Sequence, residues 1–406
     1  MFDSSSIIVG LEIGTSKVCA VVGEMNAANA LNIIGVGQAR SRGVRKGEIA
    51  EPSLAEEDVR NAIVEAEQMA NVEIRSVYLG VTGNHIRGFN NHGVHPVVSA
   101  DREITDDDVS DVIKNAKAIN LPADHTIVHA VRQHFHVDDQ SGVLYPVGMF
   151  GARLEVDVHV VHGHINRLKN SIAVVKGLQL EVDEVVFSGL ASALALLSNE
   201  QKELGSLVID FGSGATEYVV YAEGVVKHTG ALAVGGDHVS NDLAYGLKVP
   251  LGRAEQLKIE YGSALLDADV KGQTATCASE VGLPPKVINL EHLRRIMSLR
   301  LEESFALIER ELAHLGLLDR LRAGVFICGG GARVPHIQKL AENIFQLPAC
   351  VGKTNSISGL KSALDQPEFA TAIGLVKFGS LQQKRKPSNG LAHGFKAITE
   401  MFRMTA

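Results

Sequence analysis

The chain contains no tryptophan and only four cysteines among its 406 residues. Because no two cysteines have the CxxC spacing, neither a disulfide framework nor a structural zinc site is expected. No apolar run reaches the roughly 18–20 residues that a membrane-spanning helix requires. The first residues, MFDSSSIIVG, lack the basic flank of a signal peptide. We therefore expect a cytoplasmic protein with reduced thiols.

Charge is distributed unevenly along the chain. The net charge is −8, yet residues 384–406 carry five basic residues and one acidic residue. An acidic body does not suit nucleic acid, because affinity for nucleic acid comes largely from neutralised phosphates. The short basic end instead suits an anionic surface. The length exceeds that of one small hydrophobic core, so we expect several subdomains.

One order of elements occurs twice. In the first half, three strands and the start of a helix follow one another, at 7–14, 17–24, 31–38 and Pro52. The second half repeats this order at 207–212, 216–222, 225–232 and 235–236. The duplication predicts two similar lobes with a cleft between them. A dinucleotide-binding βαβ unit would place a helix directly after the first strand, so a Rossmann fold is disfavoured.

In each repeat, the first strand ends in a hairpin of small residues, at 14–17 and 212–216. Glycine allows the backbone to approach a ligand closely, and the N–H groups and hydroxyls of such a turn can bind phosphate oxygens. Lys17 adds a positive charge. Glu12 and Asp210 stand at equivalent positions near the strand ends, where they could hold a hydrated Mg²⁺ between the hairpins.

A third glycine-rich loop, at 328–333, follows the apolar strand 325–327. There a flat adenine could lie against the backbone. Any one of the three loops alone could be an ordinary tight turn. Three loops in this order, two of them in a repeated frame, predict a nucleotide site.

These loops resemble the motifs of a known superfamily. The segments GLEIGTSKV, VIDFGSGATEYVV and FICGGGARVPHI resemble the phosphate-1, phosphate-2 and adenosine motifs of the actin/Hsp70/sugar-kinase superfamily, and 189–193 and 372–375 resemble its two interlobe connections. Longer segments, NIIGVGQARSRGVRKGEI, RSVYLGVTGNHI and VVFSGLASALALL, resemble the FtsA family of bacterial actin-like division proteins. The resemblance covers nearly the whole chain and is weakest at 262–290.

The resemblance implies an α/β, actin-like (RNase H-like) two-lobed ATPase fold. The first lobe would carry an insertion called 1C, and the chain would end in an amphipathic helix. The implied divisions are 1–81, 165–197 and 355–383 for subdomain 1A, 82–164 for 1C, 198–235 and 316–354 for 2A, 236–315 for 2B, 384–390 for a linker and 391–406 for a membrane-targeting helix.

The resemblance also implies ATP and Mg²⁺ as cofactors. Residues near the phosphates and sugar would be Gly14, Thr15, Ser16, Lys17, Asp210, Gly212, Ser213, Gly214, Ala215, Thr216, Gly235 and Gly236. Residues near the adenosine would be Glu255, Lys258, Gly329, Gly330, Gly331 and Arg333. Glu255 and Lys258 are three residues apart on one helix, so an exposed ion pair is the alternative for them.

Hydrolysis is expected to be slow. Actins that hydrolyse ATP quickly position water with a glutamine, and the matching helix here offers Asn170, which is one methylene shorter. A sugar kinase would need an aspartate near a sugar pocket, and no matching segment is visible. We therefore expect the nucleotide to control conformation and assembly.

Ten of the sixteen histidines fall in the insertion. His134 and His136 alternate on a strand and share a face, as metal ligands could, but no cysteine or regularly spaced carboxylate completes a set. We expect solvated or core histidines, with metal binding or pH sensitivity as the alternatives. By resemblance, 1C would serve self-association and later division proteins such as FtsN.

The last residues form an amphipathic pattern after a polar linker. At 100° per residue, the apolar side chains share one face of a helix and basic residues lie beside it, namely Leu391, Phe395, Ile398, Met401 and Phe402 with Lys396 and Arg403. Such a helix suits a membrane interface, and anionic lipid would attract its basic residues. A helix packed on the body is the alternative.

The resemblance implies that the protein tethers the FtsZ ring to the inner membrane at the division septum and forms filaments. The acidic C-terminal peptide of FtsZ would bind a basic helix in 2B, with Arg300 as the first candidate contact beside Arg294 and Arg295. A solvated basic face is the alternative for each arginine. The alternatives for the whole chain are a PilM-like ATP-binding scaffold and a small-molecule kinase.

Overall fold

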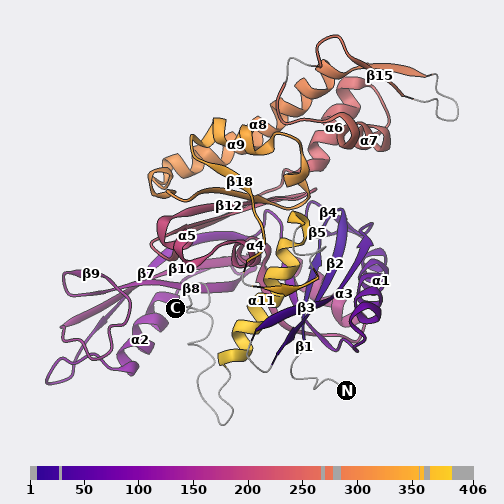
Figure 1. Ribbon diagram of the computed structural model, residues 1–406. Helices are drawn as coiled ribbons and strands as arrows, with labels where there is room; N and C mark the ends of the chain where they lie inside the picture. The colour runs from indigo at the N-terminus through magenta and orange to yellow at the C-terminus, as the bar shows by residue number, and fades with distance from the viewer. Residues whose placement is uncertain are drawn as a thin grey trace.

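The computed structural model describes residues 7–26, 30–266, 270–277, 285–355, 357–360 and 366–385. Within these ranges the chain forms sheets of six, five and four strands and two small two-stranded sheets (Figure 1). We call the three large sheets the first, second and insertion sheets. The amphipathic helix expected at 391–406 lies outside the described residues.

The first sheet has the strand order β11-β6-β1-β2-β3-β19. Its strands are β1 (Ile7–Ile13), β2 (Lys17–Met25), β3 (Leu31–Arg40), β6 (Ser76–Val81), β11 (Glu181–Phe187) and β19 (Ser358–Gly359). The first three strands form an antiparallel meander, and β6 pairs parallel with β1. Figure 1 shows α1 (Pro52–Ala70) and α3 (Ile165–Gly177) on one side of this sheet and α11 (Ala370–Arg385) on the other. Because both faces are covered, the strands read as nearly continuous apolar runs.

The second sheet repeats this plan with the order β14-β13-β12-β17-β18. Its strands are β12 (Ser206–Phe211), β13 (Thr216–Ala222), β14 (Val225–Leu232), β17 (Gly324–Cys328) and β18 (Ala349–Val351). Again three strands form an antiparallel meander and a later strand pairs parallel with the first. Glu12 and Asp210 are each the penultimate residue of the first strand, so the structure confirms the repeat predicted from the sequence.

The insertion sheet has its own apolar core. It has the order β7-β10-β8-β9, with β7 (Arg87–Pro96), β8 (His125–Val137), β9 (Gln140–Val143) and β10 (Arg153–His164). Helix α2 (Asp106–Lys117) packs on β7 and β10, and its N-terminus is held by a capping box between Thr105 and Asp108. The sheet also contacts β14, the edge strand of the second sheet.

A helical unit lies at the far end of the second lobe (Figure 1). It consists of α6 (Gly236–Leu247), α7 (Leu251–Tyr261), β15 (Thr274–Cys277), β16 (Lys286–Asn289) and α8 (Leu290–His314). The core of α8 continues into the second sheet. The remaining elements are β4 (Val44–Arg45), β5 (Glu48–Ile49), α4 (Ser188–Leu196), α5 (Asn199–Leu204), η3 (Leu318–Arg320), η4 (Gly330–Arg333), α9 (Ile337–Phe345) and η5 (Pro367–Phe369).

Two histidines of the insertion sheet are core residues. His129 accepts a hydrogen bond from the backbone N–H of Phe187, and the ring of His159 contacts Asn90 and Thr229. Burial lowers the pKa of each imidazole to about 3, so both are neutral at physiological pH.

Among the described residues, no helix is both long and apolar enough to cross a bilayer.

Candidate functional site

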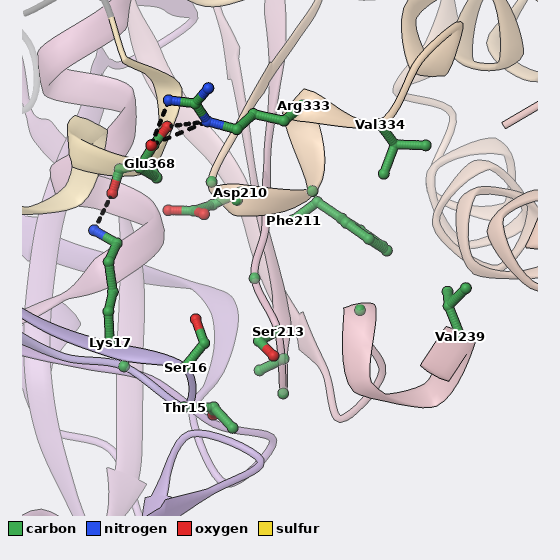
Figure 2. A pocket seen from close by; sticks show the side chains of 18 of the residues that line it. Thr15, Ser16, Lys17, Asp210, Phe211, Ser213, Val239, Arg333, Val334 and Glu368 are labelled. Carbon is green, nitrogen blue, oxygen red and sulfur yellow. Dashed lines mark hydrogen bonds and ion pairs between the residues drawn. The ribbon is translucent and has the colours of Figure 1, made fainter. Parts of the chain in front are cut away.

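A cavity of about 380 Å³ lies where the ends of the two repeats meet. Nearly all residues expected near a nucleotide line it, including both hairpins, Glu12, Asp210 and the glycine loop after β17. Figure 2 shows Thr15, Lys17 and Asp210 among them. The volume lies within the roughly 300–1,000 Å³ of typical small-molecule sites. The expected residues in its wall are Glu12, Gly14, Thr15, Ser16, Lys17, Asp210, Gly212, Ser213, Gly214, Ala215, Gly236, Glu255, Lys258, Gly329, Gly330, Gly331 and Arg333.

Three expected residues stand outside this wall. Thr216 is buried, and its hydroxyl donates to the carbonyl of Val234 at 2.7 Å. Gly235 caps α6 and packs on the backbone of the second hairpin. Asn170 is exposed on α3 and does not line the cavity.

The two hairpins have the same turn and touch each other. The N–H of Gly14 donates to the carbonyl of Lys17 at 3.0 Å, and the N–H of Gly212 donates to the carbonyl of Ala215 at 3.0 Å. Gly214 lies so close to Thr15 that a Cβ there would be 2.4 Å from the threonine Oγ1. Only glycine permits this approach. The backbone N–H groups and hydroxyls of both turns therefore border one space.

Asp210 is held at the crossing of two helices. Its Oδ2 atom accepts the hydroxyl of Ser192, on α4, at 2.6 Å and that of Thr371, on α11, at 2.8 Å. These helices contain the two segments that resemble interlobe connections. A shift in the position of the Asp210 carboxylate would therefore alter a hydrogen bond to each of the two helices.

A third carboxylate joins Glu12 and Asp210. Glu217, on β13, is paired with Asp210 across the hairpin and is buried. Burial first, and then the charges of Asp210 and Glu12, raise the pKa of Glu217 well above its usual value. Burial raises the pKa of Glu12 to about 7; Lys17 acts to lower it and Asp210 to raise it. Without a bound cation, Glu12 therefore gains and loses its proton near neutral pH, and Glu217 holds its proton more firmly than an ordinary glutamate does.

These carboxylates fit a hydrated cation. Atom Oε2 of Glu12 and atom Oε1 of Glu217 are buried without a hydrogen-bond partner in the described part of the chain. Among the same residues, no three or more His, Cys, Asp or Glu side chains are arranged to bind a metal directly. A Mg²⁺ ion here would be held through water and ligand oxygens, as the sequence predicts.

Lys17 is the cation of the first hairpin. Its Nζ lies 3.8 Å from Glu12 Oε2, donates to the carbonyl of Glu368 at 2.5 Å and lies 4.6 Å from the centre of the Phe369 ring. The carboxylate of Glu368 also accepts hydrogen bonds from the guanidinium of Arg333. Glu368 therefore lies between Lys17 and Arg333, as Figure 2 shows.

Glu255 and Lys258 form an ion pair at 2.6 Å, yet both line the cavity. Lys258 also donates to the carbonyl of Gly236 at 3.2 Å, at the start of α6. Ser240 donates its hydroxyl to the same Glu255 oxygen. The pair therefore ties α7 to the wall of the cavity and is not only an exposed surface feature.

The opposite wall is apolar and was not predicted from the sequence. It consists of Phe211, Val239, Ile259, Met297, Leu301, Val334 and Pro335. A Cβ on Gly331 would lie 1.7 Å from Phe211 Cδ1, so the absence of a side chain at residue 331 leaves room for the ring. A polar end with hairpins and carboxylates and an apolar end with an aromatic ring suit a ligand that carries phosphates and a flat base.

The arginines expected to bind a partner lie on α8, outside this wall. Arg300 donates to Asp242 at 2.5 and 3.2 Å and also contacts Glu303. The Nε of Arg294 donates to the carbonyl of Tyr261 at 3.1 Å. Arg295 is exposed. The same helix supplies Met297 and Leu301 to the cavity.

Comparisons with known proteins identify the family. A family model described as cell division protein FtsA matches residues 207–374, and one described as the SHS2 domain inserted in FtsA matches residues 83–162, the region of the insertion sheet. Cell division protein FtsA of Pseudomonas aeruginosa is 38% identical over 94% of this chain and 91% of that protein. FtsA of Escherichia coli K12 is 34% identical over 97% of this chain and 94% of that protein.

Solved structures identify the fold. The PilM–PilN type IV pilus biogenesis complex superposes with a TM-score of 0.65 and 16% identity, over 92% of this chain and 98% of that chain. MreB5 of Spiroplasma citri bound to ADP superposes with a TM-score of 0.55 and 17% identity, over 93% and 98%. The two-lobed architecture is thus actin-like, with the expected insertion in its first lobe, and the chain belongs to the FtsA family of cell division proteins.

Proposed function

We propose that this protein binds ATP with Mg²⁺ between its lobes and tethers FtsZ to the cytoplasmic membrane at the division septum. The observation that carries the nucleotide part is the pair of equivalent hairpins that meet at Thr15 and Gly214, beside Lys17 and the carboxylates. The MreB5 structure contains ADP, which supports a nucleotide in the same fold. The sheets would then correspond to subdomains 1A, 1C and 2A, and the helical unit to 2B.

In this arrangement the hairpins and Lys17 would bind the phosphates. Glu12 and Asp210 would orient the waters of Mg²⁺, which supplies charge neutralisation at the phosphates when bound. Phe211, Gly330, Gly331 and Arg333 would border the base. Asn170 lies away from the cavity, so it is not in a place to position water, and we propose slow turnover at most.

The FtsZ peptide would bind α8 at its basic face. Arg300 is already paired with Asp242 and Glu303, so an acidic peptide must replace carboxylates that the chain itself supplies. Arg295 is exposed and offers a second cation to the same peptide, and Leu299 is an exposed apolar neighbour. This composition suits a short peptide that is both acidic and apolar.

Self-association and later division proteins would use the insertion. Exposed apolar side chains gather in one loop that follows β9, namely Leu144, Tyr145, Val147 and Phe150. Apolar side chains rimmed by polar residues are typical of protein contacts. Residues 391–406 lie outside the described structure, and we propose them as the membrane helix on the basis of their sequence pattern.

Co-sedimentation with anionic liposomes tests the tether directly. The full chain is compared with one truncated after Lys386, each with and without ATP and with purified FtsZ in solution. Pelleting of FtsZ with the full chain and not with the truncated chain would support the proposal. Pelleting of the truncated chain would place the membrane contact elsewhere. If neither form pellets, the tail packs on the body, and a PilM-like scaffold becomes the better account.

A further inference from the structure

One residue, Glu368, contacts two cations of the cavity, Lys17 and Arg333, through different groups. It lies in η5, immediately before α11, which packs on the first sheet. Arg333 belongs to η4, which follows β17 of the second sheet. Lys17 belongs to the first hairpin. A contact between Glu368 and Arg333 therefore joins a wall of the second lobe to the helix of the first.

The carboxylate of Glu368 holds the Arg333 guanidinium in the forked geometry that carboxylates and arginines favour. Nε of Arg333 donates at 3.0 and 2.9 Å to the two oxygens, and the terminal nitrogen donates at 2.6 Å. The same nitrogen reaches Gln366 Oε1 at 3.1 Å. The Glu368 side chain is only 16% exposed and that of Arg333 is 56% exposed. The pair thus stands at the mouth of the cavity, with the acid inside.

The backbone of the same residue holds Lys17. The ammonium donates to the Glu368 carbonyl at 2.5 Å. The preceding residue adds another tie between the lobes, because the N–H of Gly329 donates to the Pro367 carbonyl at 3.0 Å. Burial acts to raise the pKa of Glu368, but hydrogen bonds from Arg333 and from its own backbone leave it lowered, so the acid is ionised at neutral pH.

We propose that Glu368 is a positioning residue that clasps the two lobes through Arg333 and thereby slows the release of a nucleotide from the cavity. The proposal rests on the nucleotide binding proposed above. A ligand whose base lies beside Arg333 and whose phosphates lie beside Lys17 is enclosed by this clasp. Its departure requires the walls to separate, and this separation breaks the fork.

The test uses the full chain and a fluorescent ATP analogue, with the dissociation rate measured by stopped flow after addition of excess ATP. E368Q keeps the size of the side chain and the carbonyl that holds Lys17, but removes the charge that holds Arg333. We expect dissociation about 3- to 10-fold faster, because the pair combines charge-assisted hydrogen bonds with a half-exposed arginine. Because Lys17 keeps its partner, the ratio of ATP to ADP affinity should not change.

R333K provides a second variant, since lysine cannot form the fork. If the two side chains act through each other, the double variant E368Q/R333K should dissociate no faster than either single variant. The matched control is E342Q, which removes a carboxylate from the exposed Lys339–Glu342 pair on α9, away from the cavity. Its dissociation rate should equal that of the native chain.

The outcomes separate this proposal from the proposed function. If the native chain binds no nucleotide, the proposed function fails. If the native chain binds and E368Q releases the analogue at the native rate, the clasp is wrong. Additive effects in the double variant would also overturn it. If E368Q does not fold, as judged by its thermal transition, R333K takes its place, and release of the analogue at the native rate would overturn the clasp.

Discussion

Glu217 lies directly opposite Asp210 across the β12–β13 hairpin, so two carboxylates face each other in the wall of the cavity. The raised pKa of Glu217, caused first by burial and then by Asp210 and Glu12, means that this acid ionises less readily in the folded chain than in the unfolded one. Its contribution to stability is therefore fully present below the ordinary glutamate pKa and is lost as pH rises. Ionisation of Glu217 therefore lowers the stability of the ligand-free protein, and a bound cation would reduce this loss.

The first prediction concerns Glu217. We expect E217Q to raise the melting temperature of the ligand-free protein, and to raise it more at pH 8 than at pH 6, because the amide cannot ionise. Thermal unfolding at both pH values measures this. The exposed Glu302 on α8 gives the control E302Q, which should leave the pH dependence unchanged. Equal shifts for E217Q at the two pH values would show that Glu217 does not titrate in this range.

The second prediction concerns Glu12 and the cation. Since the pKa of Glu12 is raised to about 7, chiefly by burial, protons compete with Mg²⁺ for its carboxylate near neutral pH. The gain in ATP affinity given by Mg²⁺ should therefore be larger at pH 8 than at pH 6. Calorimetric titrations with and without Mg²⁺ measure this gain. In E12Q the gain should be smaller and should change less between the two pH values than in the native chain, and a native-like pH dependence in E12Q would exclude Glu12 as the titrating group.

The third prediction concerns Lys17. Replacing it with glutamine removes the only positive charge of the first hairpin, and a charge-assisted hydrogen bond is worth about 1.5–3 kcal/mol. ATP affinity should fall about 10- to 100-fold, whereas adenosine affinity should change little because adenosine lacks phosphates. Competition titrations give both values. A parallel loss for adenosine and ATP would mean that Lys17 supports the fold of the cavity instead of contacting phosphate.

The fourth prediction compares two neighbouring glycines. In G331A the new methyl group would collide with Phe211, and crowding of this kind costs about 1–3 kcal/mol. G330A is the matched control, since no heavy atom outside its chain neighbours lies within 4 Å of a Cβ there. Denaturant unfolding should show a loss for G331A and nucleotide affinity should fall with it. Equal stability of the two variants would show that the Phe211 ring moves away without cost.

Much of the fold could be predicted because its signals are local. The apolar strands and the glycine hairpins at Gly14 and Gly212 can be recognised in short sequence segments, and their repetition predicts two lobes. The position of Glu217 also follows from the hairpin, since a turn closed by Gly212 and Ala215 places residue 217 opposite residue 210. This signal is present in the sequence, although the metal site predicted from it contains only Glu12 and Asp210.

The rest of the site depends on contacts between distant segments. Glu368 is 351 residues from Lys17 in sequence, and they meet only because α11 docks against the first sheet. Met297 and Leu301 read as ordinary core positions of a long helix, and nothing local shows that they face a cavity. The resemblance to actins predicts Asn170 in the site by analogy with a helix position. In the structure it is exposed, because the helix presents a different face to the lobe.

The last prediction concerns Arg300, whose guanidinium is paired with Asp242 on α6. An FtsZ peptide must compete with this carboxylate, so D242N should raise peptide affinity about 2- to 5-fold, the range expected for a partly buried ion pair. R300E should abolish peptide binding and leave ATP affinity intact. Fluorescence anisotropy with a labelled FtsZ C-terminal peptide measures both variants. Unchanged peptide affinity in both variants would reject Arg300 as the contact and leave Arg295 as the next candidate.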